Sequence, residues 1–428
     1  MTDTRPGIGS RDVLRIPDFR RLFVGQAISD VGDGLTFLTL LLTVNQLTHS
    51  TAALAIMSIA VALPPVTIGL FAGAYADRLD RRRIMLVSDT FRGVLVLGFI
   101  ATATLANLPF LYVLAFVQAA IGTFFSPARG ALIPRVVPAE GLLAANSMSQ
   151  VSRIIANLVG TGLAGVMLGV TGQVWPSFAI DALTFFASVA IVYGVSREIG
   201  KPDPATAGIH GSIGSSVGDG LRAIGHSRVL LATVVGLAIA MLGLGAVNVL
   251  FVPFLVNELH ETPVWAGPLE AAQTLSMILA GGLVAALASR LRATTIITIS
   301  MFGVALVVGL FAVVPNVLGL FVLLFAVGWF MTPLQAASTT LLQTSTPDAI
   351  RGRVLAAFQA CMSTTTIVST AAAGIAASVI GVRAVVGIGG IVVAFGAVVA
   401  WLLYSADRRA ERAVTSQADG SSATTIAA

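Results

Sequence analysis

Charged residues are scarce in this sequence. Asp, Glu, Lys and Arg make up 11% of its 428 residues, whereas about a quarter is usual for a soluble domain. Hydrophobic residues make up 56% and the mean hydropathy is +0.92, so the chain requires lipid as its solvent. The pI of about 10.1 would also fit a nucleic-acid-binding protein, but the arginines border apolar stretches and form no basic face interleaved with aromatic residues. The positive charge therefore indicates membrane topology.

Residues that carry enzyme chemistry are also scarce. The single cysteine, Cys361, excludes a disulfide framework and a cysteine metal cluster. The four histidines lie far apart in predicted connections, and the sequence has no G-x-x-x-x-G-K-[ST] phosphate loop through which ATP would drive the protein. We also expect no appended soluble sensor domain. We therefore expect no enzyme activity, no cofactor and no metal.

Twelve apolar stretches are long enough to cross a membrane as helices, which takes roughly 20 residues each. They are 22–48, 51–76, 84–105, 109–133, 142–170, 175–195, 229–257, 265–288, 294–314, 317–338, 352–380 and 384–404. The fold prediction is an all-α membrane protein with two six-helix bundles, 22–195 and 229–404, after an N-terminal segment, 1–21. Residues 196–228 are rich in Gly, Ser and Pro, which predicts a linker that includes a possible short surface helix. The polar tail, 405–428, is predicted to be disordered.

The basic residues orient the spans. Most of the 25 Lys and Arg residues lie in the termini, the linker or the connections after even-numbered spans, and Arg383 is the exception in an odd-numbered connection. Since positively charged connections stay in the cytoplasm, we expect both termini and the linker to be cytoplasmic. The first apolar stretch is too long for the apolar region of a signal peptide, so we expect it to be retained.

The two sets of six spans share an internal repeat. ADRLDRRRIM after the second span and ASRLRATTII after the eighth are offset by 212 residues, and the same offset places LAA at 143–145 on LAA at 355–357. Parallel halves of this kind are typical of secondary transporters, in which the halves move about a central site.

The connection after the second span resembles a loop of the major facilitator superfamily, approximately G-x-x-x-D-R-x-G-R-R/K, with Asp80 in place of its second glycine. The matching residues are Gly73, Asp77, Arg78, Arg81 and Arg82. Five further stretches are similar to the drug:proton antiporter branch that holds macrolide-efflux, enterobactin-exporter-type and Tap-like pumps: GQAISDVGDGL, SDTFRGVL, SPARGALIPRVVPAEGLLAANS, DALTFFASV and TPDAIRGRVLAA. The resemblance covers all twelve spans. It implies the major facilitator fold, a small-molecule substrate and a protein that works as a monomer.

The resemblance also implies that the charged connection is a conformational latch. In the family, its charges join the two halves on the cytoplasmic side in the outward-open state, and the expected contacts of Asp77 here are Arg351 and Arg353. Asp77 follows a helix C-terminus, which is the unfavourable end for an anion. The alternative for the arginines is that they anchor the connection to anionic lipid headgroups. The latch predicts that Asp77→Asn lowers transport without lowering expression.

Asp30 and Asp33 are the candidates for proton coupling. At about 1.5 Å per residue they lie roughly 13 and 18 Å along the helix from Arg21, at a depth where ionisable residues are costly and usually functional. They share a helix face with Gln26. Two poorly solvated carboxylates repel each other's charge, which favours proton uptake by one of them. The alternative is that they bind polar groups of neighbouring helices or lie at the wet edge of a cavity.

The fifth predicted span carries a polar stripe that is unsuited to lipid, at Asn146, Gln150, Arg153 and Asn157. Arg153 lies at about the depth of Asp33, so we predict that these two residues pair when the proton is absent, with a permanent salt bridge as the alternative. GTGLAG at 160–165 resembles the antiporter-associated segment G-P-x-x-x-G, although Thr161 replaces the proline and the small residues equally favour close packing.

Two further charged groups are predicted to have other roles. Asp89 and Arg92, one turn apart, are expected to form a local pair that supports the charged connection. Asp181 is expected to be a solvated acid near the outer end of its span or a gate residue.

Candidate cavity residues come from both halves of the chain: Gln26, Phe37, Gln150, Asn157, Asn248, Phe251 and Gln335. One charged half and one apolar half suit large amphipathic molecules better than sugars or phosphorylated anions. The sequence thus favours a proton-coupled exporter of hydrophobic or amphipathic small molecules, such as drugs, antibiotics or siderophore-like compounds. The excess of Arg over Lys suggests a GC-rich bacterial genome, hence a multi-pass protein of the bacterial inner membrane. A facilitator or importer of one dedicated metabolite is the alternative.

Overall fold

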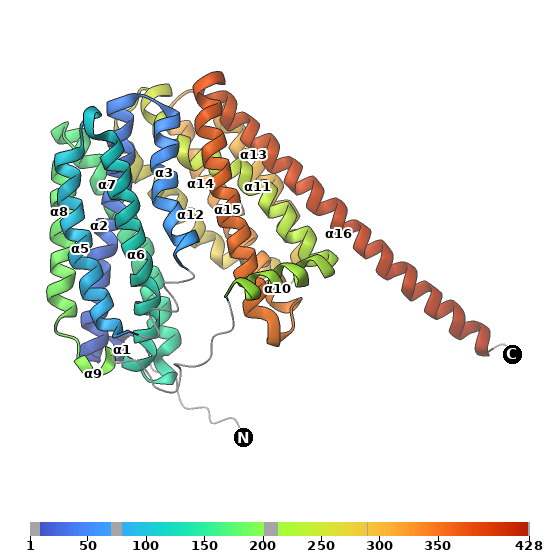
Figure 1. Ribbon diagram of the computed structural model, residues 1–428. Coiled ribbons are helices and arrows are strands. Elements are labelled where there is room, and N and C mark those ends of the chain that lie inside the picture. Colours follow the sequence, from blue (N-terminus) through green and yellow to red (C-terminus); the bar gives the residue numbers. More distant parts are fainter. Residues whose placement is uncertain (1–8, 70–78, 201–212, 289, 427–428) are drawn as a thin grey trace. The chain divides into compact units, whose positions relative to one another are not determined.

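The computed structural model describes residues 9–69, 79–200, 213–288 and 290–426, and the regular elements in these ranges are all helices (Figure 1). Up to residue 200 they are α1 (Ser10–Arg15), α2 (Pro17–Thr48), α3 (Thr51–Thr67), α5 (Arg81–Thr102), η1 (Leu105–Asn107), α6 (Leu108–Val136), η2 (Ala139–Gly141), α7 (Leu142–Thr171), α8 (Trp175–Val192) and α9 (Arg197–Gly200). From residue 213 they are α10 (Ile213–His226), α11 (Arg228–Pro253), η3 (Phe254–Glu258), η4 (Pro263–Trp265), α12 (Ala266–Ala288), α13 (Ala293–Phe311), α14 (Val317–Thr344), α15 (Asp348–Ile380) and α16 (Val382–Ile426).

The helices agree with the apolar pattern of the sequence. Eleven of the twelve predicted spans coincide with a helix for all or most of their length. In the predicted span 51–76, α3 covers Thr51–Thr67, and residues 70–76 lie outside the described residues. In the part of the chain that the structure describes, ten helices are long and apolar enough to cross a membrane, and α3 is a shorter apolar helix. The all-helical architecture is confirmed, while twelve crossings and cytoplasmic termini stay predictions.

The chain divides into two compact units. The first comprises Met1–His210 and Phe251–Ala271, and the second comprises Gly211–Leu250 and Ala272–Ala428. In the first unit, α2 packs against α7 and α8, α5 against α6 and α8, and α3 against α6. In the second, α13 packs against α14 and α16, and α10 packs against α15. Long neighbouring helices in the first unit bring residues that are far apart in sequence together, and the candidate site is built from this arrangement.

Local signals set several helix ends. α2 begins with Pro17 in its first turn, where a missing amide hydrogen costs nothing, and α7 ends at Gly172, whose φ of 68° suits glycine. The Asp80 side chain caps α5 by accepting a hydrogen bond from the Arg83 amide at 3.1 Å. After Pro253 the helix widens into the π-helical turn η3, since proline removes a backbone donor.

Two segments outside the spans contain helices. The short helix expected in the linker is present as α10. In the tail, α16 continues without a break to Ile426 (Figure 1), and the disorder expected of the tail stays a prediction. Its first part, SADRRAERA, consists mainly of Ala, Arg and Glu, which are strong helix formers.

Candidate functional site

An ion pair between Asp33 on α2 and Arg92 on α5 lies at the centre of the site. The Arg92 Nη2 donates to Asp33 Oδ1. The Arg92 side chain is 9% exposed and that of Asp33 is 38% exposed. The guanidinium carbon also lies 4.3 Å from the centroid of the Phe185 ring, a cation–π contact. A buried cation is therefore paired with an acid whose side chain is partly exposed.

This pairing corrects the predicted partner of Asp33. Arg153 instead donates to Gln150 Oε1 at 2.6 Å on its own helix, α7, and is exposed. Depth along a helix, on which the prediction rested, does not determine which face a residue occupies. Arg92 is the arginine that reaches Asp33.

Asp89 extends the ion pair toward α8. Its Oδ1 lies 3.9 Å from Arg92 Nη1, and its Oδ2 accepts a hydrogen bond from Ser188 Oγ at 2.7 Å. Asp89 is 1% exposed. The predicted Asp89–Arg92 pair is confirmed, and Arg92 lies between carboxylates from two helices.

Asp181 on α8 is fully buried, with 0% exposure, so the prediction of a solvated rim acid is wrong. Thr36 on α2 donates to its Oδ2 at 2.5 Å, and Thr184 donates to its Oδ1 at 3.1 Å. Gly32 makes this possible, because a Cβ there would overlap the Asp181 carboxylate. Asp181 thus joins α8 to α2.

Asp30 pairs with an arginine that the sequence analysis missed. Arg129 Nη1 on α6 lies 3.6 Å from Asp30 Oδ2, and both side chains are mostly buried. Arg129 lies within the fourth predicted span, 109–133, and is not among the candidate residues predicted from the sequence. Its position inside an apolar helix was the available signal.

We call these six residues the buried charge cluster: Asp30, Asp33, Asp89, Arg92, Arg129 and Asp181. They come from four helices of the first unit and comprise four acids and two bases. Such a cluster can bind and release protons, and the pairing of Arg92 with two acids allows its charge to be shared differently as they titrate. Within the described ranges, no group of three His, Cys, Asp or Glu side chains is arranged to hold a metal ion.

The candidate cavity residues differ in exposure. Gln26 is only 4% exposed and packs inside the first unit instead of lining an open surface, while Phe37 is 43% exposed. On α7 the predicted polar stripe, including Gln150 and Asn157, is exposed. Phe251 is half-buried. Asn248 on α11 and Gln335 on α14 are exposed in the second unit.

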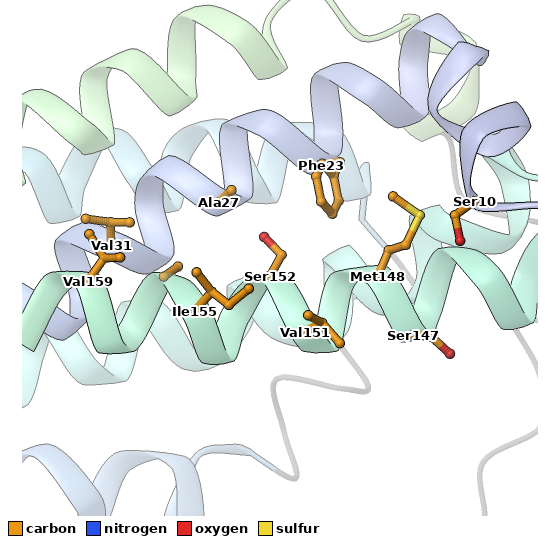
Figure 2. A pocket seen from close by; sticks show the side chains of 11 residues that line it. Ser10, Phe23, Ala27, Val31, Ser147, Met148, Val151, Ser152, Ile155 and Val159 are labelled. Atoms are coloured by element: carbon orange, nitrogen blue, oxygen red, sulfur yellow. The ribbon is translucent and has the colours of Figure 1, made fainter. Parts of the chain in front are cut away.

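A cavity of about 570 Å³ lies between α2 and α7, with Ser10 of α1 at one end. Figure 2 shows Phe23, Ala27 and Val31 of α2 near Met148, Ile155 and Val159 of α7. Its lining is mainly apolar, and it contains no member of the buried charge cluster. The apolar surface and the charged groups therefore occupy separate parts of the first unit.

Only part of the predicted latch lies among the residues that the structure describes. Gly73, Asp77 and Arg78 lie outside them. Arg82 donates to the Tyr193 carbonyl oxygen, and its guanidinium carbon lies 5.1 Å from the centroid of the Tyr193 ring. Arg81 and Arg82 are both buried at the start of α5.

The two arginines expected to contact Asp77 have partners inside the second unit. Arg353 Nη1 binds Asp219 Oδ2 of α10 at 3.1 Å. Arg351 Nε donates to the Gln343 carbonyl oxygen at 3.1 Å. These contacts fix the start of α15 to neighbouring segments.

Comparisons with known proteins agree with the helical architecture. A family model described as a transmembrane secretion effector matches residues 9–420. The chain is 26% identical over 379 residues to the uncharacterized MFS-type transporter YfiS of Bacillus subtilis (strain 168), covering 84% of this chain and 87% of that protein. It is 28% identical over 349 residues to the enterobactin exporter EntS of Salmonella paratyphi A, covering 79% of this chain and 80% of EntS.

Two solved structures share the fold. The nucleoside transporter NupG has a TM-score of 0.71 at 13% identity, with 90% of this chain and 98% of NupG covered. A bacterial homologue of the iron transporter ferroportin, in an inward-facing state, has a TM-score of 0.73 at 13% identity, with 91% and 98% covered.

Proposed function

The chain belongs to the transmembrane secretion effector family of major facilitator transporters, and on that premise we propose that it exports hydrophobic or amphipathic small molecules in exchange for protons. The observation that carries this proposal is the buried charge cluster. It has two more acids than bases, and unbalanced negative charge is costly in a poorly solvated place. Proton binding removes that imbalance, which couples the electrostatics of the site to the proton gradient.

The position of Arg92 suggests how a proton acts on the helices. Asp33 is the more exposed of its two acidic partners, and Asp89 is almost completely buried. When Asp33 takes a proton, its attraction for Arg92 weakens and Arg92 associates more strongly with Asp89 on its own helix. Loss of the proton restores the bond between α2 and α5. This gives the two helices two alternative states, which alternating access requires.

The direction and the substrate class rest on separate observations. EntS is an exporter by name, and the matching family is described as a secretion effector, which favours export. The apolar cavity between α2 and α7 has a volume in the range of roughly 300–1,000 Å³ typical of small-molecule sites. Its lining suits an apolar group, and the exposed polar stripe of α7 suits a polar one. An amphipathic drug, antibiotic or siderophore-like compound meets both requirements.

We further propose that the protein lies in the bacterial inner membrane as a monomer. We also propose that a conformational latch is formed by Gly73, Asp77, Arg78, Arg81, Arg82, Arg351 and Arg353. A test is Asp77→Asn, which should lower transport at normal expression, and normal pumping by this variant would remove the latch.

The experiment measures accumulation of fluorescent lipophilic cations and macrolide-like antibiotics in cells that express the wild type, Asp33→Asn or Asp12→Asn, with and without a protonophore. Asp12→Asn is the matched control, since Asp12 forms an exposed ion pair with Arg15 on α1. We expect the wild type and the control to lower accumulation, and both the protonophore and Asp33→Asn to abolish this. Wild-type export by Asp33→Asn that the protonophore still abolishes would contradict the coupling role. Exclusion of no compound would favour a facilitator or importer of one dedicated metabolite.

A further inference from the structure

Glu270, on α12, lies outside the buried charge cluster and has a single described hydrogen bond. Thr161 Oγ1 of α7 is 2.5 Å from Glu270 Oε2. Glu270 is partly buried, and Thr161 is 2% exposed. Glu270 is the fifth residue of α12, and a partly buried acid in an apolar helix is costly unless it has a hydrogen-bond partner.

The hydrogen bonds around Thr161 Oγ1 exceed what its one hydrogen can supply. The same oxygen lies 2.9 Å from the Asn157 carbonyl oxygen and 3.2 Å from that of Leu158. Carbonyl oxygens only accept, whereas a threonine hydroxyl has one hydrogen and two lone pairs. If Thr161 donates to its own helix, as threonine commonly does, the hydrogen in the contact with Glu270 must come from the carboxyl group.

The charges near this contact favour the same assignment. In the described part of the chain, no Lys, Arg or His nitrogen forms an ion pair with Glu270, and α12 has no other charged residue. On α7 the nearest charge is Arg153, two turns from Thr161 and bonded to Gln150. α2 packs near Thr161 and carries Asp33, whose carboxylate binds Arg92. The connection before α12 adds Glu258, His260 and Glu261.

Close backbone packing surrounds the contact. A Cβ on Gly267 would lie 2.6 Å from the Gly162 Cα, and one on Gly165 would overlap the Pro263 carbonyl oxygen. The small residues predicted to favour close packing therefore do so. A change in the hydrogen bond between Thr161 and Glu270 acts on segments already in direct contact.

We propose that Glu270 is a second proton-binding residue, separate from the buried charge cluster. We also propose that Thr161 changes its hydrogen bond within α7 when Glu270 binds or releases the proton. With the proton bound, Glu270 donates to Thr161 and Thr161 donates to its own helix. After proton release, Thr161 turns its hydrogen to the carboxylate and the bond to Asn157 is lost. The inference needs neither the export direction nor a particular substrate, so it can fail while the proposed function stands, and the converse also holds.

The test is infrared difference spectroscopy of the full chain in lipid over a pH titration. The wild type is compared with Glu270→Gln, which keeps the size and hydrogen-bonding capacity, with Thr161→Val, which removes the hydroxyl, and with Thr161→Ser, which keeps it. We expect a protonated-carboxyl carbonyl band that is lost in Glu270→Gln, shifts to higher frequency in Thr161→Val and is unchanged in Thr161→Ser. Asp33→Asn should retain the band.

Two outcomes of the infrared experiment would overturn the proposal. If Glu270→Gln removes only carboxylate absorption, Glu270 is ionised and the proposal is overturned. If the band keeps its frequency in Thr161→Val, the link between Glu270 and α7 is overturned. Should Glu270→Gln not fold, the Thr161 pair still decides, because the band must respond to valine and not to serine.

Discussion

Asn45 and Asn257 exchange two side-chain hydrogen bonds. Asn45 Nδ2 donates to Asn257 Oδ1 at 3.2 Å, and Asn257 Nδ2 donates to Asn45 Oδ1 at 3.1 Å. The two residues are 212 positions apart, which equals the offset of the predicted internal repeat. Asn45 lies in the last turn of α2 and Asn257 lies in η3, and both belong to the first compact unit.

A double-mutant cycle should detect this reciprocal pair. Asn45→Ala or Asn257→Ala leaves one amide without its partner, so each should lower the free energy of unfolding by about 1–3 kcal/mol. The double variant should lose less than the sum, with a coupling energy of about 0.6 kcal/mol and at most about 1.7 kcal/mol, the average and the maximum found for hydrogen-bonded pairs between membrane helices. Unfolding in detergent provides the measurement. Additive losses would mean that the two amides do not stabilise each other.

Arg92 offers a way to separate stability from coupling. Arg92→Met leaves Asp33 and Asp89 without their cation, and breaking a buried pair in this way costs about 3–5 kcal/mol. The triple variant Asp33→Asn, Asp89→Asn, Arg92→Met removes the unpaired charges together. It should regain most of the stability, measured by thermal unfolding, yet show no proton-driven transport. A triple variant as unstable as Arg92→Met would contradict this assignment of the charges.

Arg92→Lys tests the geometry of the same contact. A lysine ammonium is a point charge and lacks the forked guanidinium that meets Asp33 and Asp89 from different nitrogens. We expect normal expression and a large loss of proton-dependent efflux. Full activity would show that a positive charge alone suffices at this position.

The helices and the charged positions were accessible from the sequence, but most pairings were not. Long apolar runs predict helices because lipid requires every backbone group to be bonded within its own segment. Asp30, Asp33, Asp89 and Asp181 stand out for the same reason, since charges are rare in such runs. The choice between Arg92 and Arg153 depends on which helices are neighbours and how each is rotated about its axis. Periodicity within one helix carries no information on that choice.

Asp181 and Arg129 show two further limits. Position near a span end suggested a solvated acid, but Gly32 and Thr36 on α2 receive Asp181 in the interior. These partners are about 145 residues away in sequence, so local pattern does not reveal them. Arg129 follows the topology rule as one of several basic residues near a connection, although it binds Asp30. Because basic residues usually mark cytoplasmic connections, this rule gave no reason to expect an ion pair for Arg129.

Asp80 departs from the resembling loop pattern, in which glycine is usual, and its capping bond predicts the effect of substitutions. Asp80→Ala should lower the free energy of unfolding by about 1 kcal/mol, because the Arg83 amide loses its acceptor. Asp80→Asn should be nearly neutral, and Asp80→Gly should cost only a few tenths of a kcal/mol, since both residues suit this position. Thermal unfolding of the three variants tests the order, and an equal loss in all three would exclude the cap as its cause.

The bond between Thr36 and Asp181 gives a final prediction, which distinguishes a structural acid from a proton carrier. Thr36→Val removes a donor to a fully buried carboxyl group and should cost about 1–3 kcal/mol, while Thr36→Ser keeps the hydroxyl and should cost little. Asp181→Asn can preserve both contacts, because its amide can donate to Thr36 and accept from Thr184. Unfolding of Asp181→Asn should therefore resemble that of the wild type. If proton-driven efflux by this variant is also normal, Asp181 only fastens α8 to α2; if efflux is lost at unchanged stability, the proton that Asp181 exchanges is part of the transport cycle.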